Sequence, residues 1–313
     1  MNSINDYSEI VGTETINELK TIAAHLEGKI IQNINSTSVG GGVAEILSRM
    51  IPLLKELNVD ARWDLIKGGE KFFEITKKIH NSLHGIDASI SDEELEHFLK
   101  VTDDNLKDKI LDIVEKLGID PKKKTMTQIS RFDRLKDPLG VIDVYRLVKK
   151  YINCQLVLAG GTADDDPEGS QVYREVIEKA NGDKDIHILN LPPASNIEIN
   201  AIQRASTVIV QKSLKEGFGL TVSESLWKGK PVVASAVGGI PLQITHKYSG
   251  LLSRTTEGTA FYVKQLLQNP EYAANLGKNG KEHVKNNFLI THHVKNYMLL
   301  FLKTGYKEDT IFL

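Results

Sequence analysis

Short apolar segments alternate with amphipathic segments along most of this chain, and this alternation restricts the fold more than any other feature of the sequence. Five segments after residue 125 have the length and composition of strands: MTQIS (126–130), CQLVLAG (154–160), IHILNL (186–191), VIVQ (208–211) and PVVAS (231–235). Segments of helical periodicity separate them, which predicts βαβ units and an α/β fold whose parallel sheet is covered on both faces. Ligands of such sheets bind at the carboxyl ends of strands, so we expect the ligand-binding residues in the loops that follow strands.

The N-terminal third shows the same alternation with fewer strands. We expect strands at KIIQNINS (29–36) and DARWDLI (60–66). Helices are expected at 41–57, 70–84, 91–104 and 104–118. The three lysines of 122–124 are expected to form a solvated turn. A length of 313 residues suggests about two domains.

Composition and charge exclude several classes of protein. Hydrophobic residues make up 41% and charged residues 26%, and the net charge is −2 with an isoelectric point near 6.5, so nothing favours a nucleic-acid partner. Cys154 is the only cysteine, so an intrachain disulfide is impossible and a cytoplasmic location is expected. We expect neither a membrane span nor a secretory signal, because no long apolar run and no basic start are present. No spacing of metal ligands is visible, and we expect no metal and no cofactor.

The loop after the first expected strand contains three consecutive glycines, Gly40, Gly41 and Gly42. Glycines let the backbone approach a ligand closely, and the helix that follows offers amide groups to a phosphate. The dinucleotide-binding pattern G-x-G-x-x-G is absent. A turn without any ligand explains these glycines equally well.

The loop RFDRLKDPLG (131–140) follows the strand at 126–130 and carries Arg131, Arg134 and Lys136 near the start of an expected helix. Arginine offers a planar set of donors to phosphate, and lysine offers a point charge. Such a loop would hold a diphosphate, although an exposed polar loop without a ligand has the same composition.

The stretch KEGFGLTVSESLWKGKPVV (215–233) follows the strand at 208–211 and places Glu216 at the strand exit and Glu224 about two turns into the next helix. Glycines 217 and 219 would let the loop approach a ligand. A carboxylate at this position accepts hydrogen bonds from hydroxyl groups. Two carboxylates are also the general acid and base of many hydrolases, and the residues alone do not decide between the two readings.

The segment EGFGLTVSE (216–224) resembles the E-x7-E motif of retaining glycosyltransferases of family GT4, which have the GT-B fold of two Rossmann-like domains. SRFDRLKD (130–137) resembles their phosphate-binding loop, and GKPVVASAVGGIP (229–241) follows as it does in that family. The resemblance spans about residues 106–290. Within the family, NSTSVGGGVAEIL (35–47) and VGGIPLQI (237–244) look like trehalose synthases of the glycosyltransferring type, and Gln243 stands where many GT4 enzymes have glutamate.

The resemblance implies transfer of glucose from a nucleoside-diphosphate glucose to free glucose, giving α,α-trehalose. Arg131 and Lys136 would bind the diphosphate and stabilise charge on the departing oxygen, and Glu216 would bind the donor glucose. The segment 186–193 would contact the base. Substrate-binding roles are implied for Gly40, Gly41, Gly42, Gly217, Phe218, Gly219, Leu220, Thr221 and, at the ribose, Glu224. Hydrolysis is the less favoured interpretation of the two carboxylates, because the cationic loop implies a phosphate leaving group.

The resemblance also implies that the chain has three parts, and that its N-terminal part is shorter than in the family. Residues 1–105 would be a partial, acceptor-side Rossmann-like domain, 106–290 the domain that binds the nucleotide sugar, and 291–313 a helix that crosses back. Several strands and helices of the family's N-terminal domain are missing after residue 105, among them the segment with a histidine near the donor sugar. Three alternative functions therefore remain: transfer to another sugar acceptor, binding of the nucleotide sugar by a non-catalytic remnant, and isomerisation of a sugar phosphate. A homodimer is also possible.

Overall fold

The computed structural model has two compact units, and the boundary between them falls within one helix. The described residues are 3–26, 30–36, 38, 42–83, 89–161, 167–192 and 195–289. The first unit ends at Lys109 and the second begins at Ile110. The predicted boundary at residues 105 and 106 lies in the same helix, and the predicted C-terminal helix at 291–313 lies outside the described residues.

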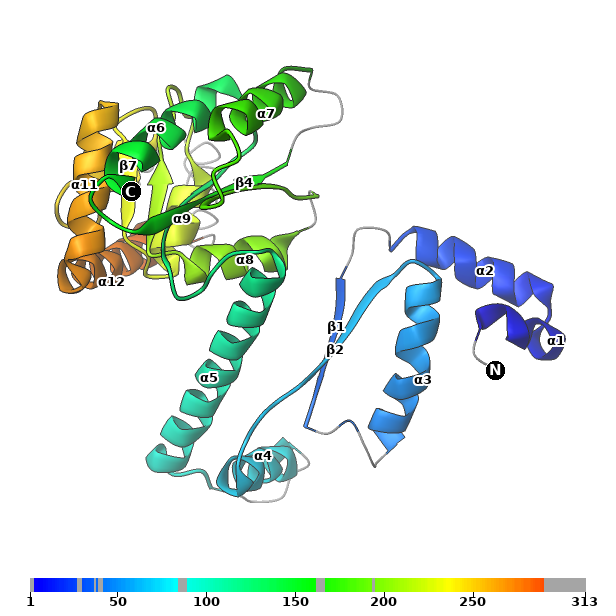
Figure 1. Cartoon of the computed structure of the whole chain (residues 1–313). Helices are drawn as coiled ribbons and strands as arrows, with labels where there is room; N and C mark the ends of the chain where they lie inside the picture. Colours follow the sequence, from blue (N-terminus) through cyan, green and yellow to red (C-terminus); the bar gives the residue numbers. More distant parts are fainter. Residues whose placement is uncertain are drawn as a thin grey trace, which may run out of the picture. The chain divides into compact units, whose positions relative to one another are not determined.

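The second unit is built on a parallel sheet (Figure 1). The sheet has six strands in the order β5-β4-β3-β6-β7-β8. Its strands are β3 (Lys124–Ile129), β4 (Cys154–Gly160), β5 (Ile186–Asn190), β6 (Val208–Gln211), β7 (Val232–Ser235) and β8 (Leu251–Ser253). The chain starts at the central β3, moves outward to β5 and returns to the other side of β3. The order therefore reverses between β3 and β6, and the carboxyl ends of these two strands form the switch point where such sheets bind ligands.

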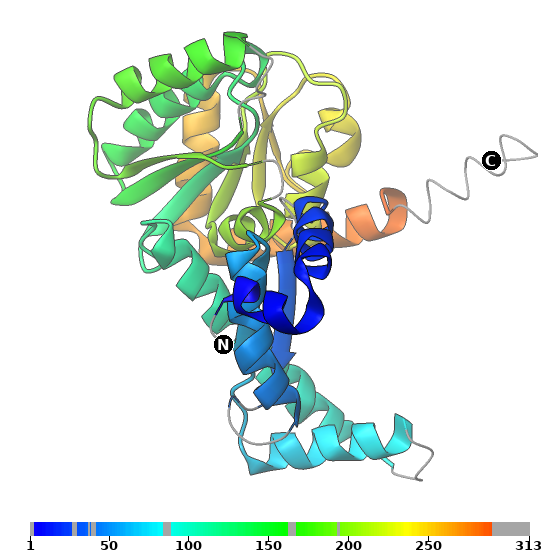
Figure 2. The same ribbon diagram turned by 90° about the vertical axis from the view of Figure 1, so that its right-hand side faces the viewer.

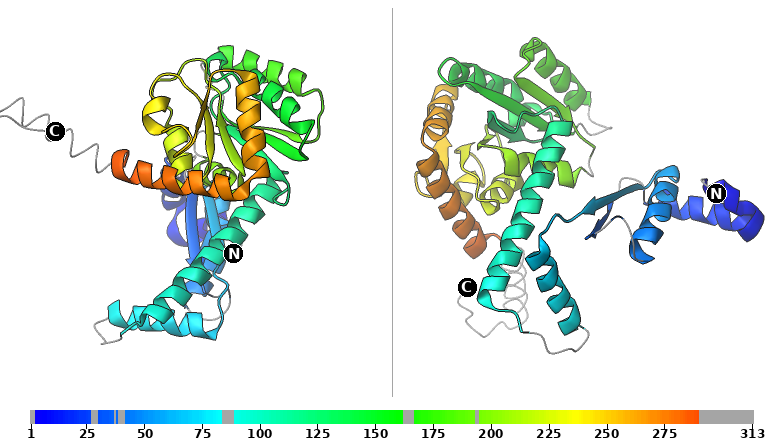
Figure 3. Two further views of the ribbon diagram at one scale, coloured as in Figure 1. Left: turned by 90° about the vertical axis from the view of Figure 1, so that its left-hand side faces the viewer. Right: turned by 60° about the horizontal axis from the view of Figure 1, so that its bottom comes forward.

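Helices cover both faces of this sheet, as the near-continuous apolar strands predict (Figures 2 and 3). The helical segments are η2 (Arg134–Lys136), α6 (Pro138–Lys149), α7 (Pro167–Ala180), α8 (Asn196–Ala205), α9 (Leu220–Trp227), α10 (Ile240–Gln243), α11 (Thr256–Gln268) and α12 (Pro270–Asn287). One core joins α6, α7 and α11 to the face that carries Met126 and Val210. The opposite face, with Ile129 and Ile209, packs against α8, α9 and α10.

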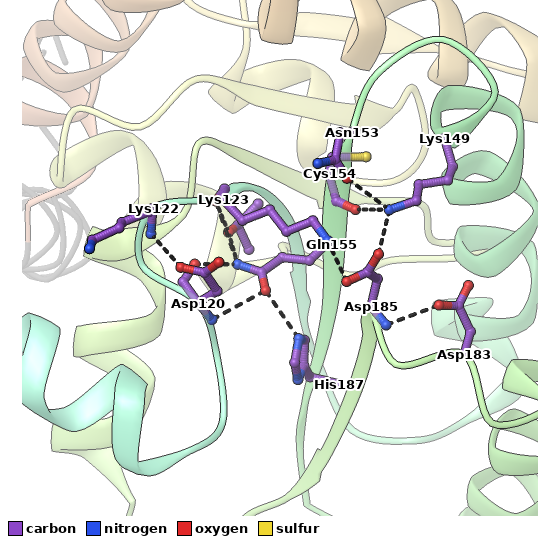
Figure 4. Close-up of polar contacts among 11 residues, drawn as sticks. Asp120, Lys122, Lys123, Lys149, Asn153, Cys154, Gln155, Asp183, Asp185 and His187 are labelled. Atoms are coloured by element: carbon purple, nitrogen blue, oxygen red, sulfur yellow. Dashed lines mark hydrogen bonds and ion pairs between the residues drawn. The ribbon is translucent and has the colours of Figure 1, made fainter.

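Hydrogen bonds and ion pairs between polar side chains connect the amino ends of β3, β4 and β5 (Figure 4). The switch point lies at the other end of these strands. Lys123 and Lys149 both donate to the carboxylate of Asp185, and their hydrogen bonds lower the pKa of Asp185. Lys124 is the first residue of β3, and its ammonium donates to the carbonyl of Leu267 at 2.7 Å. The prediction of a solvated turn at 122–124 is therefore wrong for Lys123, whose side chain is 19% exposed, whereas Lys124 is exposed as predicted but lies in a strand instead of the turn.

The first unit contains a two-stranded parallel sheet of β1 (Ile30–Asn35) and β2 (Asp60–Leu65) in its described part. Its helical segments are η1 (Ile4–Tyr7), α1 (Ser8–Val11), α2 (Thr13–Ala24), α3 (Gly42–Glu56), α4 (Glu70–Leu83) and α5 (Asp92–Lys116). Leu47 and Ile51 of α3 pack on Ala61 of β2 and form a small core. The two helices predicted at 91–104 and 104–118 are one 25-residue helix, α5, because no glycine or proline interrupts the chain between them. Among the described helices, none is both long and apolar enough to cross a membrane.

Candidate functional site

A cavity of about 350 Å³ opens at the switch point of the second unit. The loop after β3, the last residue of β6 and the start of α9 supply its walls. Its lining residues are Ile129, Ser130, Arg131, Lys136, Gln211, Glu216, Phe218, Gly219, Leu220 and Thr221. Most of the predicted site residues of this unit therefore line one cavity, although 80 residues of sequence separate Lys136 from Glu216.

Lys136 and Glu216 form a close ion pair within this cavity. The ammonium of Lys136 donates to both carboxylate oxygens of Glu216, at 2.8 and 2.7 Å. The side chains are 19% and 8% exposed, so the pair is largely shielded from water. Burial alone would raise the pKa of Glu216, but the hydrogen bond and charge of Lys136, with bonds from Ser213 and Gln211, hold that pKa below its ordinary 4.5. Glu216 is therefore ionised at neutral pH.

Two further side chains fix the carboxylate of Glu216. The hydroxyl of Ser213 donates to Oε2 at 3.0 Å, and the amide nitrogen of Gln211 donates to the Ser213 hydroxyl at 3.0 Å and points to the same Oε2 at 3.4 Å. Both supporting residues are buried. Reading the sequence did not identify either one. The signal for Gln211 was a polar residue at the end of the otherwise apolar strand VIVQ.

Two of the three cationic side chains in the loop after β3 line the cavity, and the third does not. Asp133 accepts the backbone N–H of Lys136 at 3.0 Å and so shapes η2, after which Asp137 begins α6. Arg131 and Lys136 line the cavity. Arg134 instead donates to both carboxylate oxygens of Glu175 on α7, at 3.1 and 2.9 Å. Of the three cations predicted in this loop, two therefore face the cavity, where Arg131 is paired with Asp133 at 3.3 Å and Lys136 with Glu216.

The loop after β7 packs tightly against the backbone that carries Glu216. Gly238 has a φ of +56°, and a Cβ atom there would lie 1.7 Å from the carbonyl oxygen of Glu216. The N–H of Gly239 donates to the carbonyl of Gly217 at 2.7 Å. The buried side chain of Gln243 donates to the carbonyl of Phe218 and accepts the hydroxyl of Ser223. These contacts hold the loop at 216–219 in place, so Gln243 has a visible role in positioning it.

Glu224 lies outside the cavity lining. It is the fifth residue of α9, just over one turn into the helix rather than the predicted two, because α9 begins at Leu220. Its carboxylate is exposed and accepts the side-chain amide of Gln203 at 3.1 Å. Gly217 is likewise near the cavity without lining it. The ribose role of Glu224 and the ligand role of Gly217 stay predictions.

The three-glycine loop belongs to the first unit. Gly42 is the first residue of α3, whereas Gly40 and Gly41 lie outside the described residues. Their contact with a ligand stays a prediction. Within this unit, an open hollow of about 580 Å³ lies at the carboxyl ends of β1 and β2 and is lined by Ser36, Ile66, Phe72, Phe73, Thr76 and Lys77. In the described part of the chain, no group of three or more histidine, cysteine or acidic side chains could hold a metal ion.

Comparison with known protein families gives two matches. Residues 109–283 match glycosyl transferases group 1, and residues 33–132 match the N-terminal domain of trehalose synthase. A trehalose synthase of Rubrobacter xylanophilus is 34% identical over 400 aligned positions, which cover 95% of this chain and 96% of that protein. A trehalose synthase of Thermococcus litoralis is also 34% identical, over 94% of this chain and 95% of that protein.

The chain belongs to the trehalose synthase family of group 1 glycosyltransferases. The resemblance found in its motifs is thus confirmed, and the protein is a glycosyltransferase. Since the alignment with the Rubrobacter relative runs over 400 positions and this chain has 313 residues, many positions of the relative have no counterpart here.

Solved structures confirm the GT-B fold of this glycosyltransferase. Sucrose-phosphate synthase of Thermosynechococcus elongatus superposes with a TM-score of 0.55 at 21% identity and covers 92% of this chain and 62% of that one. HepE of Anabaena, solved in complex with UDP-glucose, has a TM-score of 0.54 at 16% identity and covers 91% of this chain and 81% of that one.

Proposed function

We propose that this glycosyltransferase moves glucose from a nucleoside-diphosphate glucose to free glucose with retention at the anomeric carbon, and so forms α,α-trehalose. The observation that carries the proposal is the cavity at the switch point, where Arg131 and the pair of Lys136 and Glu216 lie together. Relatives named trehalose synthase, which match over about 95% of the chain, support the choice of reaction.

The leaving group of this reaction is a nucleoside diphosphate, and the cations of the cavity suit it. Arg131 would contact the phosphate oxygens through its planar donors and Lys136 through its ammonium. As the bond between the anomeric carbon and the phosphate oxygen breaks, negative charge grows on that oxygen, and both cations would stabilise it. Lys136 would then release part of its hold on Glu216.

Glu216 would serve the sugar half of the donor. An ionised carboxylate accepts hydrogen bonds from sugar hydroxyls and stabilises the positive charge that develops on the glucosyl ring in the transition state. Hydrolysis by a pair of carboxylates is less favoured, because Glu216 is the one carboxylate among the described lining residues of the cavity and Glu224 lies outside that lining. A general acid would also need a raised pKa, whereas the pKa of Glu216 is lowered.

The other binding roles follow from the family. The backbone from Gly217 to Thr221 would line the sugar and phosphates, Glu224 would bind the ribose and residues 186–193 would contact the base. The three glycines at 40–42 would also bind the donor. The complexes of HepE with UDP and with UDP-glucose support a nucleotide sugar as the ligand of this fold.

Two alternatives follow from the segment that the relatives have and this chain lacks. A shortened acceptor side would suit a different sugar acceptor, or would leave a protein that binds the nucleotide sugar without transferring it. Incubation with UDP-, ADP- or GDP-glucose plus free glucose tests all three readings. We expect a version that carries the relatives' segment after residue 105 to form a non-reducing disaccharide that trehalase hydrolyses, and the Glu216→Gln variant of that version to form none. From that version, a product with another acceptor, free glucose alone, or donor binding without any product would contradict the proposal.

A further inference from the structure

Gln211 has a buried oxygen for which the protein supplies no donor. It is the last residue of β6, is 2% exposed and lines the cavity beside Lys136 and Glu216. Its Oε1 has no hydrogen-bond partner within the part of the chain that the structure describes. Buried polar atoms are nearly always paired, so an exception in a cavity wall calls for an explanation.

The surroundings fix which way the amide of Gln211 points. Its nitrogen faces the Ser213 hydroxyl at 3.0 Å and the Glu216 carboxylate at 3.4 Å. The hydroxyl of Ser213 itself donates to Glu216, so it can only accept from Gln211. A carboxylate also accepts only, and the opposite orientation of the amide would place two oxygen atoms against each other. The free atom is therefore an acceptor.

An acceptor in this position selects the chemistry of its partner. Phosphate oxygens are acceptors at neutral pH and would be repelled, while Arg131 and Lys136 supply the donors that phosphate needs. A sugar hydroxyl is a donor and suits both Oε1 of Gln211 and the neighbouring carboxylate of Glu216. The cavity thus offers cations to the diphosphate and two adjacent acceptors to the sugar.

We propose that Oε1 of Gln211 accepts a hydrogen bond from a hydroxyl of the glucosyl unit of the bound nucleotide sugar, and so helps to select the sugar. This inference rests on the proposed function. In the free protein, the ion pair of Lys136 and Glu216 lies beside Gln211. When the diphosphate draws Lys136 away from Glu216, a hydroxyl gains access to both acceptors.

Gln128 provides a matched control. It is also a buried glutamine near the end of a central strand, and its Oε1 likewise has no partner among the described residues. It lies on β3 and donates to the carbonyl of Lys136 at 2.7 Å. It is not part of the cavity lining. Replacement of Gln128 removes a comparable amide without removing an acceptor from the cavity.

Calorimetry of the full chain with UDP, UDP-glucose and its 2-, 3-, 4- and 6-deoxyglucose analogues tests the inference, or the ADP series if the chain prefers ADP. We expect one deoxy analogue to bind the unmodified protein about tenfold more weakly than UDP-glucose. Gln211→Met should bind UDP-glucose about tenfold more weakly than the unmodified protein does. The substitution should not further reduce the affinity for that deoxy analogue, and it should leave the affinity for UDP unchanged. Gln128→Met should reproduce the unmodified pattern.

Two results would overturn the inference, and they are distinguishable. In the first, each deoxy analogue binds more weakly than UDP-glucose by the same factor in Gln211→Met as in the unmodified protein. Oε1 then binds water or nothing, and the proposed function stands without it. If the unmodified protein binds neither UDP, ADP nor GDP, nor their glucose esters, the proposed function fails as well. Should Gln211→Met lose UDP binding through misfolding, Gln211→Asn keeps an amide but withdraws its oxygen, and the same comparison applies.

Discussion

Lys136 and Glu216 are bonded to each other in the free protein, although each is proposed to contact a different half of the donor. Their pair keeps two charges satisfied in a site that is largely shielded from water. A ligand with a diphosphate at one end and hydroxyls at the other replaces each partner with an equivalent one. The pair therefore protects the empty site from the cost of an unpaired buried charge.

Replacement of Lys136 by methionine should destabilise the protein in a pH-dependent way. In the unmodified protein the lowered pKa of Glu216 adds stability above its unfolded value near 4.5, which is lost as the pH falls through the folded value. Without Lys136, burial would raise the pKa of Glu216, so its ionised form would destabilise the fold at neutral pH and protonation would relieve this. We expect a loss of roughly 1–3 kcal/mol in the free energy of unfolding at pH 7 and a smaller loss at pH 4. Urea titrations at both pH values measure it, and an equal loss at the two would contradict the reasoning.

Arg131 and Arg134 form a matched pair for testing the phosphate assignment. Arg131 lines the cavity with its side chain 65% exposed and lies 3.3 Å from the carboxylate of Asp133, whereas Arg134 is outside the lining and donates to Glu175. Arg131→Ala should weaken the binding of UDP or ADP by roughly 1.5–3 kcal/mol, about one to two powers of ten in the dissociation constant. Arg134→Ala should leave it unchanged. Calorimetry decides, and equal effects of the two substitutions would remove Arg131 from the site.

At the scale of elements, the loop between β7 and α10 determines where Glu216 lies. Gly238→Ala would combine strain at a φ of +56° with a clash against the carbonyl of Glu216. Gly182→Ala is the control, because Gly182 has a φ of +70° and nothing within 4 Å of the added Cβ. We expect roughly 1 kcal/mol of destabilisation at Gly182 and at least about 2 kcal/mol more at Gly238, with weakened binding of UDP-glucose only in the latter. Thermal unfolding and calorimetry of both variants test this. Equal losses of stability and of UDP-glucose affinity in the two variants would show that the close approach of Gly238 to the Glu216 carbonyl does not matter.

Elements that depend on local sequence were predicted well, and those that depend on distant partners were not. The strands at 154–160 and 208–211 have the predicted bounds, because continuous apolar runs mark strands covered on both faces. β8 was missed, since three residues are too few for a periodic signal. The cavity could be anticipated from strand exits, yet the bonds of Ser213 and Gln211 to Glu216 could not, because hydroxyl and amide side chains gain such partners only when loops are packed in three dimensions.

At the scale of the whole molecule, the two units differ in how complete they are. The second unit has a six-stranded sheet and the full set of cations, carboxylate and glycine loop at its switch point. The first has two strands in its described part, and many positions of the family's relatives have no counterpart in this chain. Binding of the nucleotide needs the second unit, whereas transfer also needs a correctly placed acceptor. Orientation of two reactants supplies a large part of the rate of such reactions.

The 313-residue chain should therefore bind nucleoside diphosphate while forming little or no trehalose, and a version that carries the relatives' segment after residue 105 should form it readily. Calorimetry with UDP, ADP and GDP measures the binding, and release of labelled trehalose from the corresponding glucose donors measures the transfer. Nucleotide affinity should be similar in the two proteins, because the residues of the switch-point cavity are the same, so a difference in rate would report on the acceptor side alone. If the 313-residue chain forms trehalose as fast as the extended version, the acceptor site is built from residues already present, and the hollow at the carboxyl ends of β1 and β2 becomes the first place to search for it.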